Sequence, residues 1–271
     1  MALLQLRDET FRKISALMYE SIGASFNANK KPLIESRLAP RLQRLGLDGY
    51  EDYLRLIRDP DDGGEFQVAV DLLTTNETYF FREPAHFAVL EREIVQRQLR
   101  AVEVWSAASS FGDEAYSIAM LLSDLMQQGR MGSNWSILGT DISDRVLRAA
   151  VTAIYPQERL HAVSPERLRR YCLRGEGEAE GKIQIHPRLR EHVRFGQLNL
   201  CQPIEDLGPF DVVFLRNVLI YFDADTKRAV VDRVLARLKP GGLFFIGTAE
   251  GRVACGTPLQ VLAPGAFRKP A

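Results

Sequence analysis

Residues 102–120, with the sequence VEVWSAASSFGDEAYSIAM, constrain the fold more than any other stretch of the chain. They begin with β-forming residues around Trp105, continue through the small residues Ser106–Ser110, and take on a helical spacing of apolar residues after Asp113. A strand, a small-residue turn and a helix in this order are typical of an open parallel α/β sheet, which binds its ligand at the carboxyl ends of its strands. We therefore expect an α/β fold with a ligand crevice after Trp105.

The turn itself indicates which ligand the crevice takes. Dinucleotide-binding loops use G-x-G-x-x-G, whose bare N–H groups face phosphate, and this turn keeps only Gly112 from that pattern. Asp113 and Glu114 follow at once, and their carboxylates would repel phosphate and favour a cation or hydroxyl groups. S-adenosylmethionine, a nucleoside that has no phosphate and carries a positive sulfonium, fits this loop. The alternative, in which both acids only complement the positive end of a helix, stays open at this point.

Composition argues against several other classes of function. Lysine plus arginine and aspartate plus glutamate both number 35 in 271 residues, so the net charge gives no reason to expect nucleic-acid or membrane binding. No apolar run is long enough to span a membrane, and we expect a cytoplasmic protein. The cysteines and histidines are scattered, which predicts no disulfide framework, no metal site and surface positions for the histidines. These residues are Cys172, Cys201, Cys255, His86, His161, His186 and His192.

Residues 1–75 are predicted to form a small helical domain, because apolar residues recur there at helical spacing with no alternating strands. One of its helices carries Arg37, Arg41 and Arg44 at i, i+4 and i+7, on one face. That face could be solvated surface, or it could be a docking strip for an acidic partner, since arginine pairs bidentately with carboxylates. Pro40 lies in the middle of this helix and could kink it.

Residues 76–271 are predicted to form the α/β domain. The segment that leads into it, residues 72–84, has an apolar centre, Tyr79–Phe81, that is unlike a free linker. We expect this segment to fold over the site. Arg82 follows the aromatic residues directly, so it would be partly shielded from water and electrostatically effective.

Two further strands are predicted to end in polar side chains at the crevice. One ends at Asp141, in the place where such folds bind ribose hydroxyls. Ser143 is predicted to cap the next helix, which leaves Asp141 for the ribose. A later, almost wholly apolar strand ends at Arg216 and Asn217, with Tyr221 shortly after.

Two segments depart from a plain nucleotide-binding fold. Residues 169–193 contain a polar, glycine-rich loop followed by the alternating residues Ile183 and Ile185. They predict a small inserted β-subdomain, which is either inert or an edge to which a partner peptide adds a strand. Residues 259–267 have the character of a terminal β-hairpin.

Four motifs, in this order, make the chain resemble the chemotaxis receptor methyltransferases of the CheR family. They are LTTNETYFFRE, WSAASSFGDEAYSIA, FDVVFLRNVLIYF and LKPGG. The resemblance runs from the helical domain to the C-terminus. It implies a class I S-adenosylmethionine-dependent methyltransferase, with a Rossmann-like sheet and a terminal hairpin, behind an all-helical N-terminal domain. Phe111 and Asp113 stand where the family's cofactor loop usually has a small polar residue and a glutamate.

The resemblance also implies an activity and a set of site residues. The activity is methyl transfer from S-adenosylmethionine to glutamate side chains in the cytoplasmic domain of chemoreceptors, giving methyl esters and S-adenosylhomocysteine. The implied cofactor contacts are Asn76, Thr78, Arg82, Glu114, Asp141, Asn199, Leu200, Arg216 and Asn217. Arg82 and Tyr221 match the positions implied to assist catalysis. The arginine-bearing helix resembles the family's substrate-facing helix, and the inserted subdomain resembles one that holds a receptor's C-terminal peptide in some members.

Two other functions stay open from the residues alone. The first is a small-molecule methyltransferase, against which the helical domain and the exposed insertion argue, because both suit a macromolecular substrate. The second is a docking or sensing module that has kept the cofactor pocket, against which the retained acids and Tyr221 argue. A dehydrogenase is disfavoured, because the glycine loop is wrong for a dinucleotide.

Overall fold

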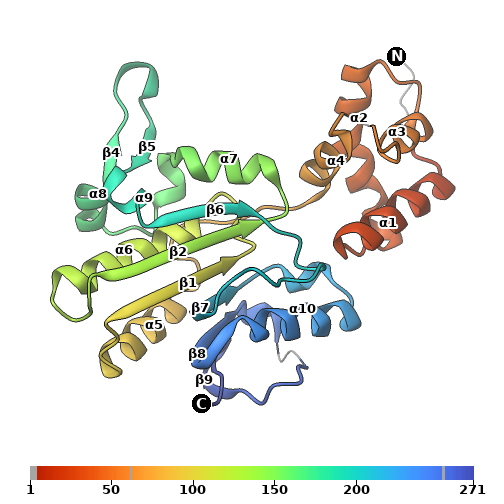
Figure 1. Cartoon of the computed structure of the whole chain (residues 1–271). Coiled ribbons are helices and arrows are strands. Elements are labelled where there is room, and N and C mark those ends of the chain that lie inside the picture. The colour runs from red at the N-terminus through yellow and green to blue at the C-terminus, as the bar shows by residue number, and fades with distance from the viewer. Residues whose placement is uncertain (1–4, 62, 252–253) are drawn as a thin grey trace.

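A computed structural model describes residues 5–61, 63–251 and 254–271. Within these ranges, residues 8–73 fold into helices without a strand, and an α/β part follows them (Figure 1). The helices of the first part are α1 (Asp8–Ile22), η1 (Ala28–Lys30), α2 (Lys31–Leu45), α3 (Tyr50–Leu56) and α4 (Glu65–Leu73). None of the helices in the described ranges is long and apolar enough to cross a membrane.

Apolar stripes hold this helical part together. The core side of α2 carries Ile34, Leu38 and Leu42, which are fully buried against residues of α1, α3 and α4. Pro40 lies on the exposed side of α2, and the helix continues through it to Leu45. The proline therefore does not break the helix, and the three arginines keep their helical spacing.

The α/β part is built on one large sheet with strand order β6-β2-β1-β7-β8-β10-β9. The pairings among β6, β2, β1, β7 and β8 are parallel, whereas β10 pairs antiparallel with both β8 and β9. The strands are β1 (Ala101–Ala107), β2 (Asn134–Asp141), β6 (Val193–Gln197), β7 (Phe210–Leu215), β8 (Leu238–Ile246), β9 (Gln260–Ala263) and β10 (Ala266–Arg268). The predicted α/β fold with a terminal hairpin is confirmed.

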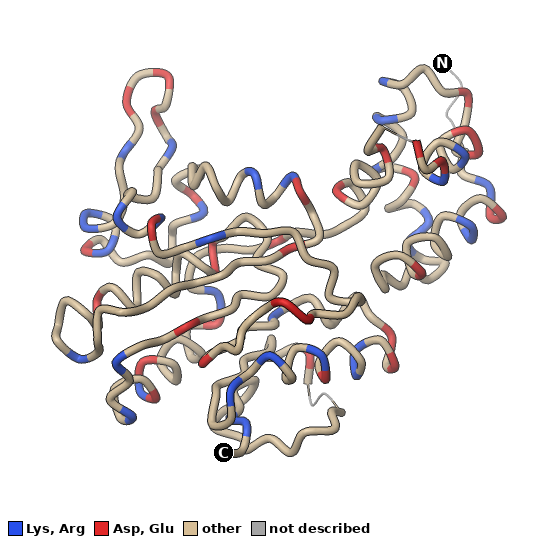
Figure 2. Tube along the Cα trace, in the orientation of Figure 1, with Lys and Arg blue, Asp and Glu red and all other residues tan. Residues whose placement is uncertain are grey.

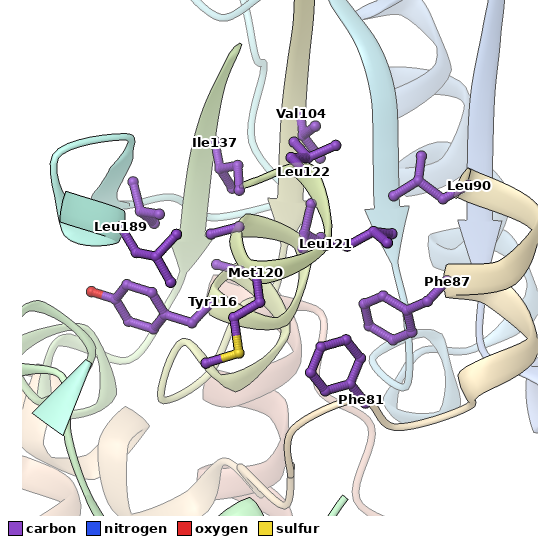
Figure 3. Close-up of a cluster of buried hydrophobic side chains, with 14 of the residues drawn as sticks. Phe81, Phe87, Leu90, Val104, Tyr116, Met120, Leu121, Leu122, Ile137 and Leu189 are labelled. Carbon is purple, nitrogen blue, oxygen red and sulfur yellow. The ribbon is translucent and has the colours of Figure 1, made fainter. Parts of the chain in front are cut away.

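Side chains of the sheet alternate between two apolar layers. In β1, Val104 packs in the layer with α5 (Pro84–Gln96) and α6 (Asp113–Gln127), while Trp105 packs in the opposite layer with α10 (Ala224–Ala236). Figure 3 shows part of the first layer, in which Val104 and Ile137 of the strands and Leu121 and Leu122 of α6 belong to one buried cluster. The helices and short helical turns of this part are α5 (Pro84–Gln96), α6 (Asp113–Gln127), α7 (Asp144–Thr152), η4 (Leu219–Tyr221), α10 (Ala224–Ala236) and η5 (Thr248–Glu250). Burial on both faces leaves the strand ends as the place for a site.

A second, smaller sheet with the antiparallel order β3-β5-β4 lies between α7 and β6 in the chain. Its strand β3 comes from Ile154–Pro156, outside the range 169–193 expected for the insertion, and Val193 already belongs to β6 of the large sheet. The sequence analysis missed β3 because three residues carry no periodicity. The other elements are η2 (Gln157–Leu160), α8 (Pro165–Tyr171), β4 (Cys172–Arg174), η3 (Gly177–Ala179), β5 (Lys182–Ile185) and α9 (Pro187–Arg190).

The ribbon formed by β4 and β5 projects away from the large sheet (Figure 1). Acidic residues gather at its tip (Figure 2), where Glu176, Glu178 and Glu180 are exposed. Because like charges at the exposed tip disfavour packing against another sheet edge, they are compatible with a ribbon that projects from the protein.

The end of α1 packs directly on the α/β part. The side-chain amide of Asn199 donates to the carbonyl of Ser21 at 2.7 Å, and the N–H of Ser25 donates to the carbonyl of Tyr221 at 3.0 Å. Gly23 ends α1 with φ of 72° at this junction. A Cβ atom on Gly23 would lie 2.5 Å from the sulfur of Cys201.

We expect Gly23→Ala to lower the free energy of unfolding by about 2–3 kcal/mol, because it adds left-handed backbone strain to a steric clash at the junction. Gly46→Ala is the matched control. Gly46 ends α2 with φ of 67°, and a Cβ atom there meets nothing within 4 Å. The control should lose only about 1 kcal/mol, from backbone strain. Chemical denaturation measures both values, and equal losses would show that the junction is not tightly packed.

Candidate active site

A pocket opens at the carboxyl ends of β1, β2 and β7 and is lined on its other side by the helical part. Its lining includes each residue that the sequence analysis assigned to the cofactor or to catalysis. These are Asn76, Thr78, Arg82, Glu114, Asp141, Asn199, Leu200, Arg216, Asn217 and Tyr221. The sequence analysis did not foresee the contribution of the helical part, from which Ile22, Phe26, Lys30 and Leu33 line the same pocket. Residues distant in sequence thus meet in one place, as the expected crevice requires.

Arg216 and Glu114 form the charged centre of the pocket. Arg216 follows β7 and is 6% exposed, and its Nε lies 3.3 Å from Oε2 of Glu114. Its Nη2 donates to the carbonyl of Arg82 at 2.6 Å. Burial raises the pKa of Glu114, and the guanidinium of Arg216 and a hydrogen bond from Ser106 act in the opposite direction. Pairing with Arg216 therefore offsets the desolvation cost of the Glu114 carboxylate, which lies in the first turn of α6 next to Ser106 of β1.

Two further carboxylates fix the loops around this pair. Glu250 accepts the N–H groups of Asn217 at 3.0 Å, Leu219 at 2.7 Å and Gly247 at 2.6 Å, which joins the loops after β7 and β8. Oε2 of Glu83 lies 3.7 Å from Nε of Arg216. Sequence reasoning missed both acids, because an isolated glutamate in a loop carries no recognisable spacing.

Asp141 is 7% exposed at the end of β2, and backbone groups hold its carboxylate. Oδ2 accepts the N–H of Ser110 at 2.8 Å and Oδ1 accepts the N–H of Ser143 at 3.0 Å. The predicted cap from Ser143 is wrong, because its side chain makes no capping hydrogen bond and its N–H is instead bound by Asp141. Each carboxylate oxygen has a second lone pair, so Asp141 can still accept hydroxyl groups from a ligand.

The segment after α4 is fastened along the pocket, as expected from its apolar centre. Phe80 and Phe81 are buried, and the N–H of Phe81 donates to the hydroxyl of Ser117 at 2.9 Å. The hydroxyl of Ser110 donates to the carbonyl of Asn76 at 3.1 Å. Arg82 is half-buried, and its Nη1 donates to the carbonyl of Glu77 at 3.0 Å. Among the described residues no carboxylate pairs with Arg82, so its guanidinium keeps donors for a ligand.

Two of the three predicted docking arginines are held within their own domain. Arg37 donates to the carbonyls of Leu73 and Thr74, at 2.9 and 3.1 Å. Arg41 forms a forked pair with Glu65, with distances of 2.9 and 2.5 Å. Arg44 is exposed. Because Arg37 and Arg41 tie α2 to α4, a strip of three free arginines is not present, and a docking role remains a prediction.

The predicted surface position is wrong for one histidine. His86 was expected at the surface, yet it is fully buried, with Nε2 3.0 Å from the carbonyl of Pro264 and Nδ1 3.2 Å from Glu83. Burial lowers the pKa of His86. Within residues 5–61, 63–251 and 254–271, no group of three histidine, cysteine, aspartate or glutamate side chains could hold a metal ion.

The donors and acceptors of the pocket fit S-adenosylmethionine. Arg216 is buried, and its Nε faces the carboxylates of Glu114 and Glu83, whereas its Nη1 has no hydrogen-bond partner among the described residues, which leaves a donor for a ligand's carboxylate. Asp141 offers acceptors for hydroxyl groups, and Glu114 adds negative charge suited to a sulfonium. The loop from Ala108 to Gly112 lacks the glycine pattern for pyrophosphate, in agreement with the sequence analysis.

Asp113 lies beside the pocket and predicts a pH effect on stability. It is fully buried, and burial raises the pKa of its carboxyl to about 6, although Arg159 partly opposes the rise. A carboxyl whose pKa is raised in the folded state stabilises the fold below its unfolded pKa, and this contribution disappears as the pH rises through about 6.

Asp113→Asn removes this titration. Relative to the wild type, we expect the free energy of unfolding of this variant to rise by about 1–2 kcal/mol between pH 5 and pH 8. Denaturation curves at both pH values measure the change. A constant difference between variant and wild type would show that Asp113 does not titrate in this range.

Comparisons with known proteins match both parts of the chain to one family. Residues 9–74 match the family model described as "CheR methyltransferase, all-alpha domain", and residues 76–257 match "CheR methyltransferase, SAM binding domain". A chemotaxis protein methyltransferase of Escherichia coli strain K12 is 40% identical over 248 residues, which cover 91% of this chain and 86% of that protein. Chemotaxis protein methyltransferase 2 of Pseudomonas aeruginosa is 39% identical over 250 residues, which cover 90% and 87% of the two chains. With both parts of the chain matched and relatives this similar over most of its length, the chain belongs to the CheR methyltransferase family.

Proposed function

We propose that this chain methylates the side-chain carboxylates of glutamates in the cytoplasmic domains of chemoreceptors, with S-adenosylmethionine as donor. Its family and the S-adenosylmethionine-binding domain of that family make it a methyltransferase. Relatives that bear the name chemotaxis protein methyltransferase support a chemoreceptor as substrate. The observation that carries the proposal is a pocket in which Glu114, Asp141 and Arg216 meet Arg82 and Tyr221.

In this proposal the pocket residues divide the work of holding the cofactor. S-adenosylmethionine, when bound, would supply a methyl group attached to a positively charged sulfur. The sulfur is the leaving group and becomes a neutral thioether. Asp141 accepts the ribose hydroxyls, Arg216 donates to the carboxylate of the methionine moiety, and Glu114 keeps Arg216 in place. Asn76, Thr78, Asn199, Leu200 and Asn217 complete the wall of the cofactor site.

The acceptor carboxylate needs alignment more than activation. A glutamate side chain has a pKa of about 4.3, so it is already the nucleophile near neutral pH and no general base is required. Transfer from a sulfonium to an anion neutralises both charges, and exclusion of water favours it. Arg82 and the hydroxyl of Tyr221 hold the carboxylate in line with the methyl group. A contact that is too strong would stabilise the ground state more than the transition state.

The receptor is proposed to approach over the helical part, which lines the pocket opposite the sheet. Arg44 is exposed on α2 and suits an acidic receptor helix. The ribbon of β4 and β5 is proposed to hold the receptor's C-terminal peptide by strand addition, since β4 is an edge strand of the small sheet. A substrate in the cytoplasmic domain of a receptor implies that the enzyme acts in the cytoplasm.

The decisive experiment uses S-adenosylmethionine labelled in its methyl group, mixed with the full chain and chemoreceptor-containing membranes. We expect label on the receptor that is released as methanol in base, as carboxyl esters release it. Label should disappear when the receptor's methylated glutamates are changed to alanine. In parallel, free carboxylic acids replace the receptor. Label on these acids, with none on any receptor, would overturn the receptor assignment in favour of a small-molecule enzyme.

A further inference from the structure

Arg159 connects the inserted subdomain to the start of the cofactor pocket. It lies on η2, directly after β3, and its Nη2 is 2.9 Å from Oδ2 of Asp113 and 3.2 Å from the carbonyl of Thr78. Asp113 is the first residue of α6, whereas Thr78 belongs to the segment that leads into the α/β part. One guanidinium therefore bridges two pocket-forming segments that are 35 residues apart in the chain, from an element that belongs to neither.

Two aromatic rings pack against the guanidinium of Arg159 and restrict its position. Its guanidinium lies 4.7 Å from the ring centre of Phe111 and 5.7 Å from that of Tyr155, within the range of cation–π attraction. Tyr155 is itself buried, and its hydroxyl donates to the carbonyl of Phe111 at 2.7 Å. The side chain of Arg159 is 24% exposed, so solvent screens its pairing with the fully buried Asp113 only in part.

The bridge is continuous with the ribbon. The N–H of Gln157, two residues before Arg159, donates to the carbonyl of Gly181 next to β5, at 3.0 Å. On the other side, the ring of His161, the residue directly after η2, lies 5.4 Å from the ring of Tyr79, which adds a second contact with the segment that carries Thr78. Movement at the base of the ribbon would thus reach Thr78 through one short, packed element.

We propose that Arg159 is a positioning residue of the cofactor pocket, which holds Thr78 against the start of α6 and couples the inserted subdomain to S-adenosylmethionine binding. Arg159 does not line the pocket itself. It acts by fixing the main chain of residues 76–82, from which Asn76, Thr78 and Arg82 line the pocket. The part of the proposal that concerns the cofactor rests on the proposed function.

The first test measures hydrogen exchange of the full chain without ligand, for the wild type, Arg159→Ala and Arg159→Lys. We expect backbone amides of residues 76–82 to exchange at least tenfold faster in Arg159→Ala. Arg159→Lys should be intermediate, because an ammonium keeps the charge but lacks the planar fork. Arg169→Ala, an exposed arginine of α8, is the matched control and should exchange like the wild type. Unchanged exchange in residues 76–82 of Arg159→Ala overturns the proposal, whatever the enzyme methylates.

The second test measures binding of S-adenosylhomocysteine by calorimetry, together with steady-state methylation. We expect Arg159→Ala to raise the Kd and the KM for the cofactor about tenfold while kcat changes less than twofold. Arg159→Lys should restore about a third of the lost affinity, and Arg169→Ala should match the wild type. Faster exchange with an unchanged Kd would overturn the coupling to the cofactor. Tight cofactor binding without receptor methylation in the wild type would count against the proposed function and not against the role of Arg159.

Discussion

Replacing Arg216 by methionine is expected to abolish S-adenosylhomocysteine binding and to lower the free energy of unfolding by about 3–5 kcal/mol. The reason is that Arg216 is 6% exposed and is the cation beside Glu114 and Glu83. Removing one partner of a buried pair leaves the other charge desolvated without compensation. The donor to the carbonyl of Arg82 is lost as well. Calorimetric titration with the cofactor product and denaturant unfolding measure the two effects.

Two further variants separate stability from binding. Arg228→Met removes an exposed arginine of α10 and should change stability by less than about 0.5 kcal/mol. Glu114→Gln in the Arg216→Met background should regain part of the lost stability, because it removes a buried charge, but it should not regain cofactor binding. The deficit of Arg216→Met should also shrink toward low pH, since a carboxyl whose pKa is raised takes up a proton more readily in the folded state. A deficit independent of pH and of Glu114 would contradict the charge-pairing account.

Arg82→Ala is expected to lower kcat/KM for receptor methylation about 100-fold, a loss of about 2.7 kcal/mol in transition-state stabilisation. Its guanidinium makes no ion pair among the described residues and lines the pocket, so its donors are available to a substrate carboxylate. Tyr221→Phe removes a single hydroxyl and should lower the rate only about threefold to tenfold. Initial rates with labelled cofactor and receptor membranes measure both variants.

The control for Arg82→Ala is Arg82→Lys, which keeps the positive charge and loses the fork that can align both carboxylate oxygens. We expect its rate to lie between those of the wild type and the alanine variant. If Arg82→Ala left both methylation and cofactor affinity unchanged, the assignment of Arg82 would be wrong. If it weakened cofactor binding alone, Arg82 would belong to the cofactor site and Tyr221 would be left to orient the acceptor.

The strands and the polar residues at their ends were predictable because both depend on short patterns in the sequence. Asp141 and Arg216 each follow an apolar run, and parallel strands bring their carboxyl ends to one edge of the sheet. The same rule placed Glu114 after the turn beyond Trp105. Gly23 was predictable as the end of α1 for a similar reason, since it adopts a left-handed conformation that other residues take only with strain.

Contacts between distant segments were not predictable in this way. Arg37 and Arg41 share a helical face, yet their partners, the end of α4 and Glu65, lie more than 20 residues along the chain. His86 is buried against the carbonyl of Pro264, and no local spacing predicts this contact because the two residues are 178 positions apart in the chain. No sequence pattern distinguishes Arg159 from the other arginines, because its contact with Asp113 forms only when η2 packs beside α6 in the folded chain.

The sequence by itself determined the class of fold and the family, and it predicted the edge of the sheet at which the pocket lies, because periodicity, turn chemistry and motif order act over short stretches. Only the tertiary structure decided which charges are free and which are paired. Pairing depends on the distance between side chains from separate elements, and burial sets its strength. For this reason two of the three arginines of α2 tie that helix to α4 and the third is exposed. Glu83, Glu250 and Arg159 lie outside the pocket and contact residues or segments that form it.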